Sequence, residues 1–198
     1  MLRPAHGFPT GWSSVLLPDL PADGSGAGAA EGEVMTNAIL SIDQKYRYSL
    51  TRDLGMVGEG ACCFVMLNPS TADATQDDQT IRRCIGYARS FGCWRLEVVN
   101  LFAYRSTDPN LLYGMSRDVA VGPENDWHIR AACLGSRIVV CAWGNHGSLF
   151  GRATEVLAII RGRGATPMAL KINNKSQQPA HPLYLRADAK FTPYKPIY

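Results

Sequence analysis

The sequence predicts an α/β fold in which helices cover both faces of a central, mainly parallel sheet of four strands. Two observations lead to this prediction. Four short apolar runs are continuous rather than alternating, as is typical of strands that are buried on both faces. Segments with a helical repeat separate these runs, and such alternation favours parallel strands joined by crossover helices.

The expected elements follow one another in a regular order. An alternating segment at residues 46–52 is rich in strand formers and predicts an N-terminal edge strand. The buried strands are expected at residues 61–67, 96–101, 137–143 and 167–172. Helices are expected at residues 77–91, 124–134 and 148–160, because apolar side chains recur there on one face and a glycine follows each segment.

The first 34 residues differ from the rest in composition. They are rich in Gly, Ala and Pro, and the run at residues 22–30 is typical of a flexible linker. We therefore expect a disordered tail over residues 1–34 and a single α/β domain over residues 35–198. A chain of 198 residues fits one domain of this kind.

The basic residues are concentrated near the C-terminus, although the formal net charge of the chain is only +3. Residues 160–198 contain seven Lys or Arg and a single acidic residue, Asp188. This distribution favours a surface that faces a polyanion. A solvated tail is the alternative explanation.

The six cysteines contain no C-x-x-C pair, which disfavours a zinc or iron–sulfur site, so neither a metal nor a cofactor is expected. Cys62, Cys63 and Cys141 lie in apolar runs and are expected to be buried thiols. No apolar stretch approaches the roughly 20 residues of a membrane span, and the N-terminus does not follow the signal-peptide pattern. We expect a cytoplasmic protein without membrane contact.

Polar residues follow each of the four predicted buried strands, and ligands of open parallel sheets bind outside the carboxyl ends of the strands. The residues at these ends are Asn68-Pro69-Ser70 with Asp73, Asn100, Gly144-Asn145, and the loop around His181. Each has a structural alternative: a turn, a satisfied buried amide, or a strand–helix connection. His181, between two prolines and without apolar periodicity around it, favours a functional role. His128, within a predicted helix, is expected at the surface.

Two segments, residues 64–73 and 98–109, resemble the bacterial and phage family known as domain of unknown function 1643, and the resemblance extends over residues 46–194. The same landmarks resemble the uracil-DNA glycosylase superfamily. Residues 66–70 are similar to its Gly-hydrophobic-Asn-Pro-Gly motif, with Met66 and Ser70 in place of the glycines. Residues 98–101, 138–144 and 181–186 resemble its base-reading strand, its third strand and its His-Pro loop.

This resemblance implies a three-layer α/β/α fold and an N-glycosylase that acts on a damaged or modified base in DNA. The catalytic residues it implies are Asn68, which positions water, His181, which donates to the base, and Asp73 near the sugar. Asp77 or Asp78 can supply that carboxylate instead, although capping of the next helix is their alternative role. The base-binding residues implied are Asn100, Pro69, Ser70, Phe102, Gly144 and Asn145. The DNA-binding residues implied are Leu183, Tyr184, Arg105, Lys175 and Arg186.

Two other functions remain open at this point. One is a non-catalytic reader that binds a modified base or nucleotide without cleaving it. The other is a hydrolase of small nucleotides or nucleosides on the same fold. A catalyst predicts that the Asn68 amide and the His181 ring face each other across a base-sized cavity. A cavity filled by Tyr184 or Met66 favours a reader or a structural role. A continuous basic groove favours DNA, and an enclosed pocket favours a small molecule.

Overall fold

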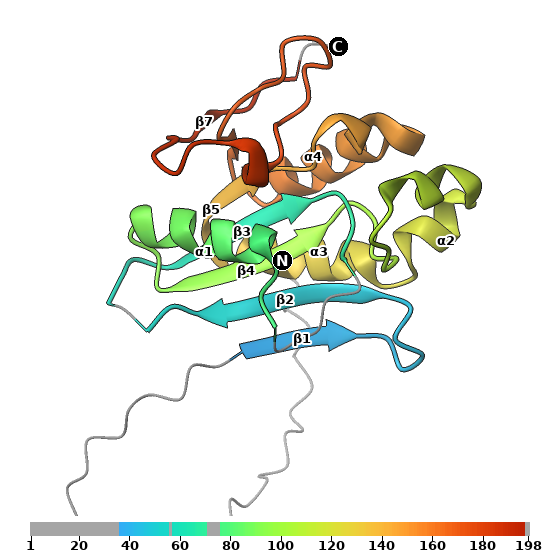
Figure 1. Cartoon of the computed structure of the whole chain (residues 1–198), viewed down its shortest axis with the longest axis horizontal. Coiled ribbons are helices and arrows are strands. Elements are labelled where there is room, and N and C mark those ends of the chain that lie inside the picture. Colours follow the sequence, from blue (N-terminus) through green and yellow to red (C-terminus); the bar gives the residue numbers. More distant parts are fainter. Residues whose placement is uncertain (1–35, 56, 71–75, 197–198) are drawn as a thin grey trace, which may run out of the picture. The chain divides into compact units, whose positions relative to one another are not determined.

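The computed structural model describes residues 36–55, 57–70 and 76–196, and every statement below concerns these residues. They form one sheet of seven strands in the order β1-β2-β4-β3-β5-β6-β7 (Figure 1). The strands are β1 (Thr36–Leu40), β2 (Arg47–Asp53), β3 (Ala61–Met66), β4 (Arg95–Asn100), β5 (Ser136–Cys141), β6 (Pro167–Ala169) and β7 (Thr192–Pro193).

The centre of this sheet confirms the predicted α/β class. Strands β4, β3, β5 and β6 are parallel neighbours, and they match the four apolar runs. The predicted strand number is wrong, because β1, β2 and β7 add antiparallel pairs at the two sides. The predicted edge position of residues 46–52 is also wrong: β1 pairs along the outer side of β2. Strand β1 escaped prediction because its five residues show no alternation of apolar and polar side chains.

The described helices are α1 (Gln79–Ser90), α2 (Arg117–Val121), α3 (Asn125–Leu134) and α4 (Arg152–Gly162), with short 3-10 helices η1 (Pro109–Gly114), η2 (Asn145–Gly151) and η3 (Pro182–Tyr184). The start of α1 follows from its N-cap, since the Asp78 carboxylate accepts the backbone N–H of Ile81 at 2.8 Å. Helix α4 begins at Arg152 rather than at the predicted residue 148. Positive φ angles at Phe150 and Gly151 interrupt the chain immediately before it.

Two apolar clusters lie on opposite faces of the sheet. Neighbouring strand residues point to opposite sides, and Cys63 belongs to the cluster with α3 and α4, whereas Cys62 belongs to the cluster with α1. Helices therefore cover both faces, with α1 on one side (Figure 1). All six cysteines are buried and free, as expected for Cys62, Cys63 and Cys141. Among the described helices, none has the length and apolar character that a membrane crossing requires.

The strand order places a crevice at one end of the sheet. The chain leaves β3 toward β4 on one side and later enters β5 on the other side of β3. The connections after β3 and β5 therefore diverge, which is the arrangement at which ligands bind in open parallel sheets. The sheet thus brings the loops after its parallel strands together around one crevice.

Candidate functional site

A cavity of about 580 Å³ lies at the carboxyl ends of the parallel strands. It is lined by residues from the loops after β3, β4, β5 and β6, which are far apart in the sequence. Eight of the candidate ligand contacts predicted from the sequence line it: Asn68, Ser70, Asp78, Asn100, Gly144, Asn145, His181 and Tyr184. The structure therefore gathers the core of the predicted site into one place.

Other predicted base contacts lie away from the cavity lining. Phe102 is fully buried in the core and packs edge-to-face against Phe150, with ring centroids 6.2 Å apart. Pro69 is buried, and its carbonyl accepts the backbone N–H of Ser106 at 2.9 Å, so it braces the loop. The side chain of Leu183 is half-buried and is not part of the cavity lining.

The predicted phosphate contacts also lie outside the lining. Arg105 donates to the carbonyl of Gln44 in the β1–β2 turn at 3.0 Å. Arg186 is exposed and pairs with Asp188 at 3.1 Å, and Lys175 is exposed. Asp73 lies outside the described residues.

Asn100 is the most informative residue of the cavity. It is only 1% exposed, and its Nδ2 has no hydrogen-bond partner among the described residues. Its backbone carbonyl accepts from Nδ2 of Asn125 at 3.0 Å. A buried side-chain donor without a partner is costly, and native structures rarely keep one without a reason. The Asn100 amide therefore marks a position at which a ligand can complete the hydrogen bonding.

The amide of Asn68 has a different role. Its Nδ2 donates to the carbonyl of Ser106 at 2.8 Å and more weakly to that of Pro69 at 3.3 Å. These bonds join the loop after β3 to the loop after β4. The donor side of the amide is thus used within the protein, which leaves Oδ1 as the atom with which Asn68 can position water or a ligand.

His181 is held as a neutral imidazole at the cavity wall. Burial lowers the pKa of His181 below its ordinary value of 6.5, while the charge of Asp78 opposes this effect. Its Nδ1 accepts the backbone N–H of Leu183 at 3.4 Å, so the hydrogen of the neutral ring resides on Nε2. Gly144 adjoins the base of this side chain, because a Cβ added there would lie 3.9 Å from the Cβ of His181. His181 thus offers an N–H donor.

Helix α1 holds the loop that carries His181. The Tyr87 hydroxyl donates to the carbonyl of Arg186, and the Arg83 guanidinium donates to that of Leu185. Tyr184 in the same loop is 83% exposed although it lines the cavity. Tyr184 therefore stands at the mouth of the cavity and does not fill it.

Three lining residues with a charged or imidazole side chain were not predicted as ligand contacts: Arg47, His146 and Lys171. Lys171 follows the fourth parallel strand, so the strand-end rule could have found it. His146 adjoins the predicted Asn145, and its Nδ1 is 2.8 Å from the Tyr113 hydroxyl. Asp78, predicted either as a carboxylate of the site or as the cap of α1, caps the helix and also lines the cavity. Its carboxylate accepts from the Ser70 hydroxyl at 3.2 Å. The sequence did not indicate Arg47 as a ligand contact, because its strand was expected to have one face exposed to solvent.

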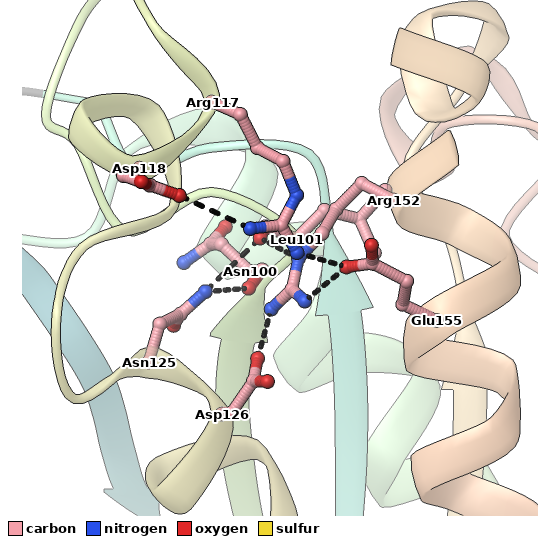
Figure 2. A network of polar contacts seen from close by, with 8 residues as sticks. All are labelled: Asn100, Leu101, Arg117, Asp118, Asn125, Asp126, Arg152 and Glu155. Atoms are coloured by element: carbon pink, nitrogen blue, oxygen red, sulfur yellow. Dashed lines mark hydrogen bonds and ion pairs between the residues drawn. The ribbon is translucent and has the colours of Figure 1, made fainter. Parts of the chain in front are cut away.

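A network of buried hydrogen bonds and ion pairs contacts the backbone at the end of β4 (Figure 2). Arg152 is fully buried; its Nε donates to the carbonyl of Leu101 at 2.9 Å, and its terminal nitrogens pair with Asp126 and with Glu155. Asn125 donates to the carbonyls of Asn100 and Leu101, both at 3.0 Å. The backbone that carries the Asn100 side chain is therefore fixed by two buried donors.

Within the residues that the structure describes, no group of His, Cys, Asp or Glu side chains is arranged to hold a metal ion. The cavity is instead a hydrogen-bonding site. Its lining carries amide, imidazole, hydroxyl and charged groups of both signs. Such a site can bind a polar, flat ligand through donors and acceptors at several edges.

Comparisons with known proteins give one match. No curated protein and no solved structure matches the chain. The family described as "Protein of unknown function (DUF1643)" matches residues 47–183, which is more than half of the chain and includes every cavity residue except Tyr184 and Leu185. The protein is therefore a member of the DUF1643 family.

Proposed function

We propose that the protein recognises a nucleobase in this cavity and hydrolyses the N-glycosidic bond that joins the base to its sugar in DNA. The observation that supports the proposal best is the Asn100 amide, which is 1% exposed and carries a donor without a partner among the described residues. A side-chain amide offers one donor edge and one acceptor edge side by side. The edge of a pyrimidine-like base offers the complement.

The arrangement of the fold supports the same proposal. The parallel strands β4, β3, β5 and β6 have α1 on one face and α3 and α4 on the other. A three-layer fold like that of the uracil-DNA glycosylases requires helices on both faces of the sheet in this way. The three-layer arrangement is therefore part of the proposal. Asn68, Asn100, Gly144 and His181 stand at the strand ends in the order that the resemblance implies.

The proposed reaction uses the polar groups of the cavity in three roles. The Oδ1 of Asn68 positions a water molecule, whose oxygen attacks the anomeric carbon as the C–N bond breaks. The electron pair of that bond moves onto the departing base, and the Nε2–H of His181 donates to its oxygen. The Asp78 carboxylate faces the cationic sugar, and the proton of the water ends on the base.

A glycosylase assay tests this function. Labelled single- and double-stranded oligonucleotides that carry uracil, hypoxanthine or modified bases are incubated with the protein, and alkali then reveals abasic sites. Removing the donor of His181 by His181→Ala should lower the rate by about 10²–10³. Asn68→Ala and Asn100→Ala should also lower it, whereas Asn174→Ala, in an exposed residue outside the cavity, should not. Absence of cleavage on every substrate would refute catalysis.

One observation favours a non-catalytic reader as the second candidate. The Asn68 amide nitrogen is committed to the carbonyls of Ser106 and Pro69, so this residue has a structural role besides any contact with water. A reader predicts binding without cleavage. In that case Asn100→Ala should abolish base-dependent binding of the oligonucleotides, and no alkali-labile product should form on any of them.

A further inference from the structure

An exposed tyrosine stands beside the cavity on the segment that follows β4. The chain lines the cavity at Thr107 and Pro109 and then continues through η1, which carries Tyr113. The Asp108 carboxylate accepts the backbone N–H of Asn110 at 2.9 Å and so fixes the start of η1. Tyr113 is 56% exposed. A large aromatic ring is thus left facing solvent within a few residues of the cavity wall.

The Tyr113 ring is held in place by a residue of the cavity lining. Its hydroxyl lies 2.8 Å from Nδ1 of His146, and the two rings meet at an angle of 76° with their centroids 5.7 Å apart. His146 lines the cavity from η2. An exposed side chain ordinarily samples several rotamers, and this hydrogen bond reduces that freedom before any ligand binds. Tyr113 therefore presents an oriented aromatic surface to solvent.

A second exposed aromatic ring stands at the mouth of the same cavity. Tyr184 lines the cavity and is 83% exposed, and the centroid of its ring lies 5.7 Å from that of His181. Gly144 adjoins the Cβ of His181, and His146 follows Gly144 by two residues. A row of contacts through the cavity lining therefore joins the two exposed tyrosines.

An unpaired nucleic-acid strand has the chemistry that fits two exposed rings beside a base-sized cavity. Every base offers an aromatic face, and stacking of a base on an aromatic side chain contributes about 1–3 kcal/mol whatever the base is. A base held in the cavity leaves its neighbours in the same strand close to the mouth. In a duplex these neighbours are already paired and stacked on other bases, so their faces are not free to contact a side chain.

We propose that Tyr113 stacks on the base next to the one held in the cavity, and that the substrate is therefore single-stranded DNA. This assignment rests on the proposed recognition of a base, and it adds the strand type and a contact outside the cavity. Tyr184 then serves as a second stacking surface and not as a wedge that enters a duplex.

Binding of oligonucleotides that lack one base tests this contact. The probes are the single-stranded oligonucleotides of the glycosylase assay and matched strands in which the nucleotide on the 5′ or the 3′ side of the target base is a tetrahydrofuran spacer. The spacer keeps the phosphate and removes the aromatic face. The wild type should lose about 5- to 100-fold in affinity when the base that stacks on Tyr113 is removed. It should also bind the intact single strand at least about fivefold more tightly than the matching duplex.

Substitution of Tyr113 gives the decisive comparison. Tyr113→Ala should weaken binding of the intact strand by the same factor as the spacer and should not weaken binding of the spacer strand further. Tyr113→Phe should retain most of the affinity, because the ring remains and only its bond to His146 is lost. Trp127→Ala is the matched control, because Trp127 is also an exposed aromatic residue, at 65%, but lies on α3 and does not line the cavity. It should leave the affinity unchanged. Equal losses in Tyr113→Ala with and without the spacer would overturn the proposal, since they would indicate a structural role of the ring.

The outcomes distinguish this inference from the proposed function. If Asn100→Ala leaves binding unchanged while the spacer and Tyr113→Ala weaken it, base recognition in the cavity fails and stacking by Tyr113 stands. If Asn100→Ala abolishes base-dependent binding while the spacers leave the wild-type affinity unchanged, stacking fails and base recognition stands. If Tyr113→Ala does not fold, Tyr113→Leu, which keeps most of the bulk without an aromatic face, takes its place. Tighter binding of the duplex, or no binding of any single strand, contradicts the inference.

Discussion

Replacement of Arg152 by Met should destabilise the protein far more than loss of a surface arginine. The side chain is fully buried and bonds to the carbonyl of Leu101 and to Asp126 and Glu155. Removing one partner of a buried ion pair costs about 3–5 kcal/mol. Asp126 and Glu155 are 42% and 40% exposed, so water can solvate them afterwards, and we expect a loss of about 2–4 kcal/mol.

Denaturant unfolding followed by tryptophan fluorescence measures this loss, and the melting temperature should fall by roughly 5–15 °C. Arg117→Met is the matched control. Arg117 contacts the same Glu155 at 2.7 Å, but it is 43% exposed, so its removal should cost at most about 1 kcal/mol. If the two variants lost the same stability, the buried network would not support the end of β4.

Two further perturbations test the folded structure. Burial lowers the pKa of both His128 and His181 below 6.5, so the unfolded chain binds more protons than the folded protein as the pH falls. The free energy of unfolding should therefore decrease below about pH 6.5. Urea unfolding midpoints that stay constant or rise between about pH 7 and 5 would contradict this. A Cβ at Gly147 would overlap the Trp143 indole, so Gly147→Ala should lower the free energy of unfolding by about 1–3 kcal/mol. Gly86 lies in α1 with open space around it, so Gly86→Ala should raise the free energy of unfolding by about 0.5–1 kcal/mol. Equal unfolding midpoints for the two alanine variants would refute this account of the loop.

The central part of the fold was predictable from local pattern. Continuous apolar runs are required of strands buried on both faces, and they located β3 to β6. Strand β1 has no such pattern, and its place depends on pairing with β2 across a short turn in which the N–H of Ser41 donates to the carbonyl of Tyr46. Pairing between strands is a tertiary property, so the sequence pattern of residues 36–40 did not reveal it.

The site was predictable where it depends on strand ends, and unpredictable where it depends on side-chain direction. Asn68 and His181 follow predicted strands, and Asn100 lies near the end of one; all three line one cavity. Tyr48 is an extra residue between Arg47 and Ser49 in the pairing of β2 with β1, a β-bulge that no residue type marks in advance. Arg47, beside this bulge, lines the cavity. The expected surface position of His128 is also wrong: it is 7% exposed, and the Tyr48 ring stacks on it.

The unpartnered amide of Asn100 tests the account most directly. Its side-chain NH₂ signal in a ¹H–¹⁵N spectrum, assigned by its loss in Asn100→Ala, is followed as nucleotides and the oligonucleotides of the glycosylase assay are added. The NH₂ signal of Asn125 is the internal control, because this amide is also buried but already donates to the carbonyls of Asn100 and Leu101. The account predicts a large, saturable shift at Asn100 and little change at Asn125. Saturable binding that leaves the Asn100 signal unmoved would contradict it.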